Sequence, residues 1–313
     1  MRAVTFRAFG GPEVLMLEDL PSAAPPGDGE VAVDVFATTV NPTDLMMRSG
    51  QQAAMMADLP PPWIAGMEFA GVVVAAGQGA LPIGTPVMGV VNPRRLKGGA
   101  YAQRILVPAA SVVAVEHGTD LVAAATVPMN ALTALLALEA LNLKPGATLL
   151  VTGAAGVLGG HVVALAKANG LRVLANVSAA DAADLRGNAT ILPRDDGMAA
   201  ALRAIVPDGV DGLVDCALMG SVAEALVRDG GAAVSVRRSQ PVQDPRLCGE
   251  VVSVLSGMER RDLLDRVGLG FTEGTFRPRV ASGGVFPAER ASDAHRMAET
   301  RGFRGRVVIT LAS

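Results

Sequence analysis

The stretch that decides the fold is LLVTGAAGVLGG, residues 149–160. An apolar strand runs into a glycine-rich turn that opens a helix. Glycines there allow a tight bend, close approach of a pyrophosphate and close packing of helix on strand. The N–H groups and positive dipole end of the helix favour a bound phosphate. The alternative is a purely structural turn. The residues expected to hold the dinucleotide are Gly153, Ala155, Gly156, Val157, Leu158 and Gly159.

Short apolar strands alternate with helices on both sides of this turn. Repeated β-α units of this kind predict a parallel, doubly wound sheet. We therefore expect a Rossmann domain over residues 119–270. The expected strands are 147–152, 172–177, 190–192, 212–216 and 232–236, and the expected helices are 121–141, 158–169, 179–186, 197–206 and 221–228.

The two ends of the chain have a different character. Residues 1–118 contain short strands separated by Gly, Pro and Asn, a pattern typical of a compact, partly closed antiparallel barrel. The last forty residues predict a strand, an amphipathic helix and a final strand. The expected strands of the first part are 1–7, 14–17, 30–38, 69–76 and 85–91; the elements of the last part are 276–280, 287–300 and 306–311.

Composition narrows the class of protein. The chain has 313 residues, 50% of them hydrophobic, and a net charge of −3 without a basic run, so a nucleic-acid partner is not expected. Residues 121–143 are the most apolar segment, but Pro128, Asn130 and Glu139 interrupt it, which favours a core helix over a membrane span. The two cysteines, Cys216 and Cys248, are too few for a disulfide framework and indicate a cytoplasmic protein.

The end of the second strand of the Rossmann domain bears on the choice of coenzyme. An acidic residue there would bind the 2′-hydroxyl of NAD and repel the 2′-phosphate of NADP. The strand ends with Asn176 and Ser178, which can donate hydrogen bonds to a phosphate, and the first carboxylate is Asp181. Arg194, after the next strand, supplies a positive charge or is a solvated loop residue. This pattern favours NADP(H).

Several motifs follow one another along the whole chain: NPTDLMMRSG at 41–50, PWIAGMEFAGVV at 62–73, GGAYA at 98–102, LTA at 132–134, AAGVLG at 154–159, AHR at 294–296 and RGRVV at 304–308. In this order they resemble the medium-chain dehydrogenase/reductase superfamily, in its zinc-free, quinone oxidoreductase-like branch. The resemblance implies that residues 1–118, completed by 271–313, form one GroES-like catalytic domain. It also implies a nicotinamide between the two domains and a homodimer. The expected fold class is α/β: a Rossmann sheet plus a GroES-like β-barrel.

The resemblance also implies roles for single residues. Asn41 would orient the nicotinamide or the substrate, and Asn130 and Thr133 would face the nicotinamide and pyrophosphate, although Thr133 is equally typical of helix packing. Arg304 would reach the adenosine phosphate or would point to solvent. Asp44 is either catalytic or a first-turn residue that meets the helix dipole after Pro42.

Metal chemistry is not expected. No cysteine precedes Cys216, and His117, His161 and His295 form no ligand pair. We expect a structural role for Glu68, which matches a residue near the metal of zinc relatives, and expect His295 to face a partner or solvent. Without a Lewis acid, reduction of an activated C=C bond needs less assistance than reduction of a simple ketone.

The expected function is NADPH-dependent reduction of an enone, enoyl group or quinone. Met46 stands where related proteins often carry Tyr, so the proton donor stays unassigned, and Tyr101 is expected to pack in the core. The methionines between Met46 and Met56, together with Trp63, are expected near the cleft and suit a small hydrophobic substrate, although each methionine is equally typical of core packing. Two alternatives stay open: an NADPH-binding sensor or structural protein without turnover, and a carbonyl or alcohol oxidoreductase.

Overall fold

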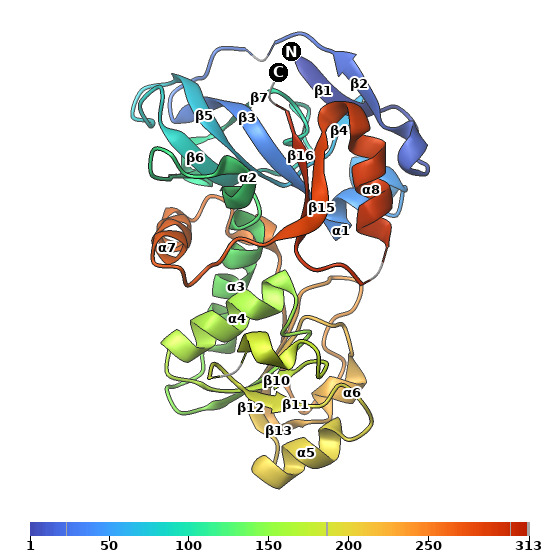
Figure 1. Cartoon of the computed structure of the whole chain (residues 1–313), viewed down its shortest axis with the longest axis vertical. Helices are drawn as coiled ribbons and strands as arrows, with labels where there is room; N and C mark the ends of the chain where they lie inside the picture. Colours follow the sequence, from blue (N-terminus) through green and yellow to red (C-terminus); the bar gives the residue numbers. More distant parts are fainter. Residues whose placement is uncertain (23, 186, 301, 312–313) are drawn as a thin grey trace. The chain divides into compact units, whose positions relative to one another are not determined.

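The computed structural model describes residues 1–22, 24–185, 187–300 and 302–311. The chain folds into two compact units (Figure 1). Unit 1 consists of Met1–Met129 together with Met258–Ser313, and unit 2 consists of Asn130–Gly257. The two ends of the chain therefore build one unit, and the middle of the chain builds the other.

Unit 1 is built on antiparallel strands. Its larger sheet has seven strands in the order β15-β16-β3-β5-β6-β8, and β7 also pairs with β3. Only the pair β15–β16 is parallel among the described pairs of this sheet. A smaller sheet has the order β2-β1-β4. The strands are β1 Arg2–Phe6, β2 Met16–Asp19, β3 Glu30–Val40, β4 Trp63–Ile64, β5 Glu68–Ala76, β6 Pro86–Val90, β7 Arg104–Pro108, β8 Val112–Ala114, β15 Val280–Pro287 and β16 Arg306–Thr310.

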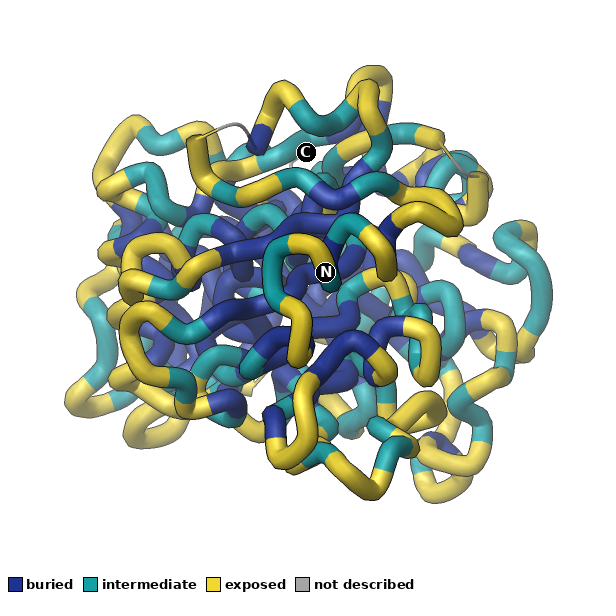
Figure 2. Tube along the Cα trace, turned by 90° about the horizontal axis from the view of Figure 1, so that it is seen from below, coloured by how far each residue is buried: buried dark blue, intermediate teal, exposed yellow. Residues whose placement is uncertain are grey.

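The long strand β3 organises unit 1. It pairs with β5, β7 and β16, so strands from both ends of the chain meet on it. Its valines join a core with Phe69, Tyr101 and Ile309. Buried residues lie mostly on the inside, while many of the outer bends of the chain are exposed (Figure 2). The helices of this unit are α1 Pro42–Arg48, α2 Leu121–Ala124, α7 Arg261–Thr272 and α8 Ala291–Glu299.

Unit 2 is a parallel sheet with the strand order β11-β10-β9-β12-β13-β14. Counted along the chain this is 3-2-1-4-5-6, the order of a Rossmann fold. The first strand, β9, is buried at all five positions, as a central parallel strand covered on both faces should be. The strands are β9 Thr148–Thr152, β10 Arg172–Asn176, β11 Thr190–Leu192, β12 Val210–Asp215, β13 Val227–Ser235 and β14 Cys248–Val251, and the helices are α4 Val157–Ala168, α5 Met198–Ile205 and α6 Ser221–Glu224, with α3 Pro128–Leu141 leading into the unit.

These sheets confirm the predicted fold class, but several elements differ from the sequence-based expectation. The helix expected over 121–141 is two helices, because the chain bends before Pro128, which starts α3. The helix expected over 221–228 ends at Glu224, since Val227 already pairs with Val210 in the sheet. The strand expected over 276–280 lies later, at β15.

The helix expected over 179–186 is only a 3-10 turn at Ala182–Leu185, and Arg186 lies outside the described residues. The Ser178 hydroxyl donates to the Asp181 carboxylate at 2.5 Å, and the Asp181 N–H bonds the Ser178 carbonyl. Such local side-chain bonds compete with helix formation.

The boundaries of the two units also differ from the expected ones. We expected changes after residues 118 and 270, whereas the units change after Met129 and Gly257. The reason is packing: α2 contacts β3 and β5, and α7 contacts β8. Both helices therefore belong to unit 1.

The apolar segment Leu121–Leu141 is long and apolar enough to cross a membrane by length and composition alone. Among the described residues it is the one such segment, and 72% of its most apolar window is buried inside the protein. Burial against other parts of the chain is what a core helix requires.

Candidate nucleotide-binding turn and apolar pocket

The glycine-rich turn of unit 2 lies at the carboxyl end of β9, next to β12. These neighbours are the first and fourth strands of the sheet, where its order reverses, and ligands of such sheets bind there. Gly153 has φ +57°, which favours glycine. A Cβ on Gly159 would lie 2.4 Å from the Gly153 carbonyl oxygen, so helix and turn touch through bare backbone.

Helix α4 starts at Val157, directly after this turn. Gly156 is its N-cap and makes no side-chain hydrogen bond to the helix. The first N–H groups of a helix have no partner inside the helix, and their dipoles add. The structure thus brings the six predicted turn residues together between the end of β9 and the first turn of α4.

Sequence reasoning missed a polar pair beside the turn. The Thr152 hydroxyl donates to the Asp215 carboxylate at 2.5 Å and accepts from the Ala217 N–H at 3.0 Å. Asp215 also accepts from the Gly220 N–H. The pair fixes the carboxyl ends of β9 and β12 to each other. The sequence feature that could have revealed this pair is Asp215, an acidic residue at the end of a mostly buried strand.

The end of β10 carries the residues expected to choose the coenzyme. The Asn176 side-chain nitrogen donates to the Pro193 carbonyl at 2.8 Å and contacts the Met198 sulfur, so it is already used within unit 2. The Ser178 hydroxyl is bonded to Asp181. Arg194 is exposed and follows β11.

The other predicted cofactor residues lie on other elements. Asn130 and Thr133 are both buried, near the start of α3. Arg304 is exposed in the segment of unit 1 that precedes β16.

Asn41 and Asp44 form one buried network in unit 1. The Asp44 carboxylate accepts from the N–H groups of Asn41, at 2.8 Å, and Gly66, at 2.9 Å. The Asn41 side-chain nitrogen donates to Thr39, at 2.9 Å, and to Glu68, at 3.1 Å. Its amide oxygen is buried, and no described residue bonds it. Asp44 therefore holds the start of α1 while Asn41 keeps one free acceptor.

The Asp44 carboxyl of this network is strongly perturbed. Complete burial raises the pKa of Asp44 to about 7, although the two N–H groups act in the opposite direction. Glu68 accepts from the Thr39 hydroxyl at 2.5 Å and from the Met129 N–H at 2.8 Å. Its carboxylate is thus occupied by hydrogen bonds within unit 1.

His295 does not face solvent, contrary to our expectation. It is fully buried, because α8 packs on β15 and β16, and burial lowers its pKa to about 3. Its Nε2 lies 3.1 Å from the Tyr101 hydroxyl and its Nδ1 lies 3.4 Å from Arg48. Arg48 also pairs with Glu299 at 2.5 Å. Tyr101 is fully buried, in agreement with the packing role predicted for it.

Among the residues that the structure describes, no group of three or more His, Cys, Asp and Glu side chains is arranged to hold a metal ion.

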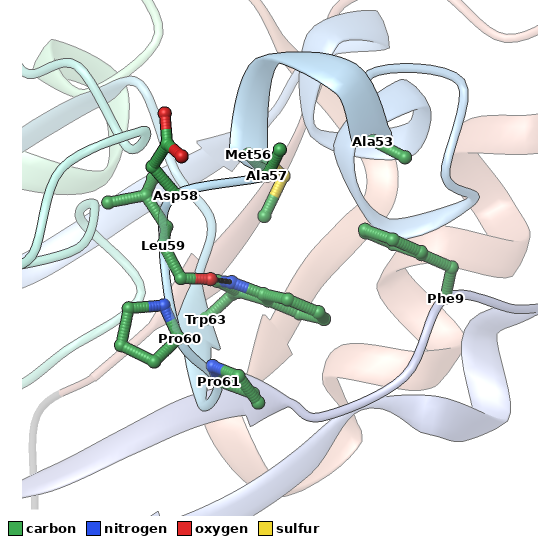
Figure 3. A pocket seen from close by; sticks show the side chains of 9 residues that line it. All are labelled: Phe9, Ala53, Met56, Ala57, Asp58, Leu59, Pro60, Pro61 and Trp63. Carbon is green, nitrogen blue, oxygen red and sulfur yellow. Dashed lines mark hydrogen bonds between the residues drawn. The ribbon is translucent and has the colours of Figure 1, made fainter.

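An apolar hollow of about 470 Å³ opens on unit 1 (Figure 3). Phe9 and Trp63 stack with ring centroids 4.8 Å apart, and Met56 lies on the same hollow. The Trp63 indole N–H donates to the Leu59 carbonyl at 2.8 Å, which fixes the ring. The remaining lining residues are Ala53, Ala57, Asp58, Leu59, Pro60 and Pro61. The sequence singled out Met56 and Trp63, but the contribution of Phe9 required the fold.

Comparison with known proteins agrees with this architecture. Residues 27–117 match the family model of the alcohol dehydrogenase GroES-like domain, and residues 188–309 match the model named zinc-binding dehydrogenase. A solved alcohol dehydrogenase superfamily protein of Novosphingobium aromaticivorans has the same fold: the TM-score is 0.86 at 21% identity, with 100% of both chains covered.

Similar sequences occur in animals and plants. The synaptic vesicle membrane protein VAT-1 homolog of Rattus norvegicus is 29% identical, over 99% of this chain and 84% of its own. The quinone oxidoreductase of Sus scrofa is 27% identical, over 99% and 98%. The chloroplastic NADPH-dependent alkenal/one oxidoreductase of Arabidopsis thaliana is 28% identical, over 99% and 79%. With its GroES-like and Rossmann folds, the chain belongs to the medium-chain dehydrogenase/reductase superfamily of oxidoreductases, in the quinone oxidoreductase-like branch.

Proposed function

We propose that this chain is an NADPH-dependent reductase of activated C=C bonds or quinones that works without a metal. The observation that carries the proposal is the glycine-rich turn at the point where the order of the parallel sheet reverses. A bound nicotinamide would supply the hydride there. The backbone N–H groups at the start of α4 would hold the pyrophosphate.

The preference for NADPH has support in unit 2 and in one relative. Neither Asn176 nor Ser178 is acidic, and Arg194 offers an exposed positive charge after the neighbouring strand. The Arabidopsis relative is named for NADPH. The proposal requires the Ser178 hydroxyl to exchange its bond to Asp181 for one to the 2′-phosphate. Because Asp181 would repel that phosphate, Arg194 has to offset its charge.

Two residues of unit 1 have proposed roles in the reaction. We assign Asn41 to orientation of the nicotinamide or substrate, because its buried amide oxygen is a free acceptor for an N–H or O–H group. Asp44 acts as a positioning residue, since both of its oxygens are bonded to backbone N–H groups around Asn41. Met46 offers no proton, so water delivers the proton that completes the reduction.

The hollow at Phe9 and Trp63 is the proposed binding place of a small hydrophobic substrate. Apart from Asp58 its side chains are apolar or aromatic, as in pockets that bind apolar ligands. We also propose a cytoplasmic location.

The side chains present support the proposal that the reduction needs no metal. Zinc in enzymes is held mainly by Cys, His and carboxylate groups. The carboxylates of Glu68 and Asp44 are both engaged by hydrogen bonds, and the described cysteines, Cys216 and Cys248, lie in unit 2. Hydride addition to a conjugated substrate creates a negative charge that moves onto an enolate or quinol oxygen. Such a substrate therefore depends less on a metal ion than a simple ketone does.

The test is NADPH oxidation by the purified protein with paired substrates, each conjugated enone or quinone beside its saturated ketone. We expect turnover of conjugated members only. Tight NADPH binding without oxidation of any member would favour a sensor or structural role instead, and stoichiometric zinc with alcohol oxidation would refute the proposal.

The coenzyme assignment has its own test. Arg194→Ala should weaken NADPH binding by about tenfold and leave NADH binding unchanged, since one charge-assisted contact is lost. The matched control is Arg172→Ala, which removes an exposed arginine at the opposite end of β10. Equal affinity of the parent protein for both coenzymes would contradict the assignment.

A homodimer is proposed from the open edge of the Rossmann sheet. Strand β14 pairs with β13 on one side and ends the described sheet, and Cys248, Gly249 and Glu250 on it are exposed. An exposed edge strand is a template for pairing with another chain. Light scattering should give twice the chain mass of 31.9 kDa; a monomer at micromolar concentration would refute this.

A further inference from the structure

Trp63 also lines a second, smaller hollow. It shares Leu59, Pro60 and Trp63 with the apolar pocket, so the two hollows adjoin at these residues. Its volume is about 20 Å³, enough for one group of the size of a water molecule. Pro93, Leu96 and Gly98 form much of the rest of its lining.

Arg95 supplies the charge in this hollow. Its Nε donates to the Gly98 carbonyl at 2.9 Å, and the Gly98 N–H returns a bond to the Arg95 carbonyl at 2.9 Å. The guanidinium is thus held against the backbone of the turn formed by residues 95–98. That turn is packed tightly, because a Cβ on Gly98 would lie 2.7 Å from Ile64. The position of the charge is therefore fixed by the fold.

The guanidinium has unused donor capacity. Its Nη2 is buried, and no described residue accepts a hydrogen bond from it. Glu30 attracts it only at longer range, since Glu30 pairs with Lys97 at 3.0 Å and accepts from the Gly27 N–H. The Trp63 N–H is committed to Leu59. A buried, charged N–H group without an acceptor is costly, so the Nη2 atom of Arg95 favours an anion as its partner.

We propose that the hollow between Arg95 and Trp63 is an anion subsite that accepts one oxygen of a carboxylate. The carboxylate belongs to the substrate, whose apolar part occupies the adjoining apolar pocket, or to a free organic anion. The planar fork of an arginine suits either source. The assignment to a substrate carboxylate rests on the proposed reductase function, whereas the assignment to a free organic anion does not.

Trp63 gives a direct readout of binding, because it is the only tryptophan of the chain. The experiment titrates the protein with formate, and in parallel with formamide as its neutral counterpart, and follows the single indole N–H resonance and the tryptophan emission. We expect a saturable shift with formate and none with formamide. A shift that is linear in formate, or identical with formamide, would overturn the proposal.

Variants locate the site. Arg95→Gln should raise the formate dissociation constant by about tenfold or more, since a hydrogen bond to a charged group is lost. Arg95→Lys should give an intermediate value, because it keeps the charge without the fork. The matched control Lys97→Gln removes a neighbouring charge from the same loop and should leave formate binding unchanged. Unchanged binding in Arg95→Gln would refute the assignment. If that variant does not fold, Arg95→Lys and the formamide comparison still decide.

A second arm distinguishes the two sources. A conjugated enone that carries a carboxylate is compared with its methyl ester in parent protein and in Arg95→Lys. A substrate carboxylate predicts a KM advantage of the acid that is lost in the variant, with formate as a competitor of the acid. A free anion predicts equal KM values and formate binding that does not compete. Absence of all turnover would refute the reductase function and leave the formate result standing.

Discussion

Replacing Gly159 by Ala should destabilise the protein, although alanine is the better helix former. Its Cβ would lie 2.4 Å from the Gly153 carbonyl oxygen and 2.7 Å from the Ala154 Cα, both backbone atoms. Contacts of real Cβ atoms stay above 3.0 Å, so the turn would have to move by at least 0.6 Å. Overpacking of this kind costs about 3 kcal/mol, and the gain in helix propensity is about 1 kcal/mol. We expect a net loss of about 2 kcal/mol.

Gly156→Ala is the matched control. Its Cβ would meet only the Gly153 oxygen, at 3.2 Å, and its φ of −69° suits any residue. We expect a stability loss below about 0.5 kcal/mol but NADPH binding weakened by about tenfold, because the methyl group stands where the pyrophosphate approaches. Urea unfolding followed by circular dichroism measures stability, since Trp63 reports only on unit 1. Equal stability of Gly159→Ala and the parent, or equal losses in both variants, would refute the reasoning.

Three further predictions concern single side chains. The pKa of Asp44 is raised by burial from 3.8 to about 7, so its contribution to the free energy of unfolding is complete below pH 3.8 and is lost as the pH rises through about 7. Urea midpoints should accordingly fall between about pH 4 and about pH 7 in the parent and fall less in Asp44→Asn; equal slopes would contradict this. Asp181→Ala should strengthen NADPH binding about threefold or more relative to NADH, because a charge near the 2′-phosphate is removed; calorimetry that finds an unchanged ratio would exclude that role. Trp63→Ala should raise the KM for an aromatic enone about tenfold at nearly constant kcat, since a stacked wall of the pocket is lost, whereas a change in kcat alone would place the substrate elsewhere.

The sequence predicted the Rossmann sheet well because its central strands, β9, β10 and β12, are short, apolar and mostly buried. Elements that form because they pack against residues distant in the sequence were harder to predict. Helix α7 contains Gly268 and Gly270, which are poor helix formers. In the structure a Cβ on Gly268 would lie 2.6 Å from Val113, so glycine is required for packing that sequence alone does not reveal. The same holds for β14, whose short run Cys248–Val251 is defined by its pairing with β13.

The two candidate sites also differ in how far their residues are separated along the sequence. The glycine-rich turn is local, so one short segment specifies its geometry. The surroundings of Asn41 are assembled from Thr39 on β3, Glu68 on β5 and Asp44 on α1, and residue types alone do not say that Asp44 bonds only backbone N–H groups. A short-range pattern is therefore enough to predict the glycine-rich turn and the helix that follows it. Which carboxylate holds the backbone, and which amide keeps a free acceptor, follow only from the assembled barrel. For this reason the proposed role in the reaction falls to Asn41 and not to Asp44, even though the two lie within one helical turn of each other.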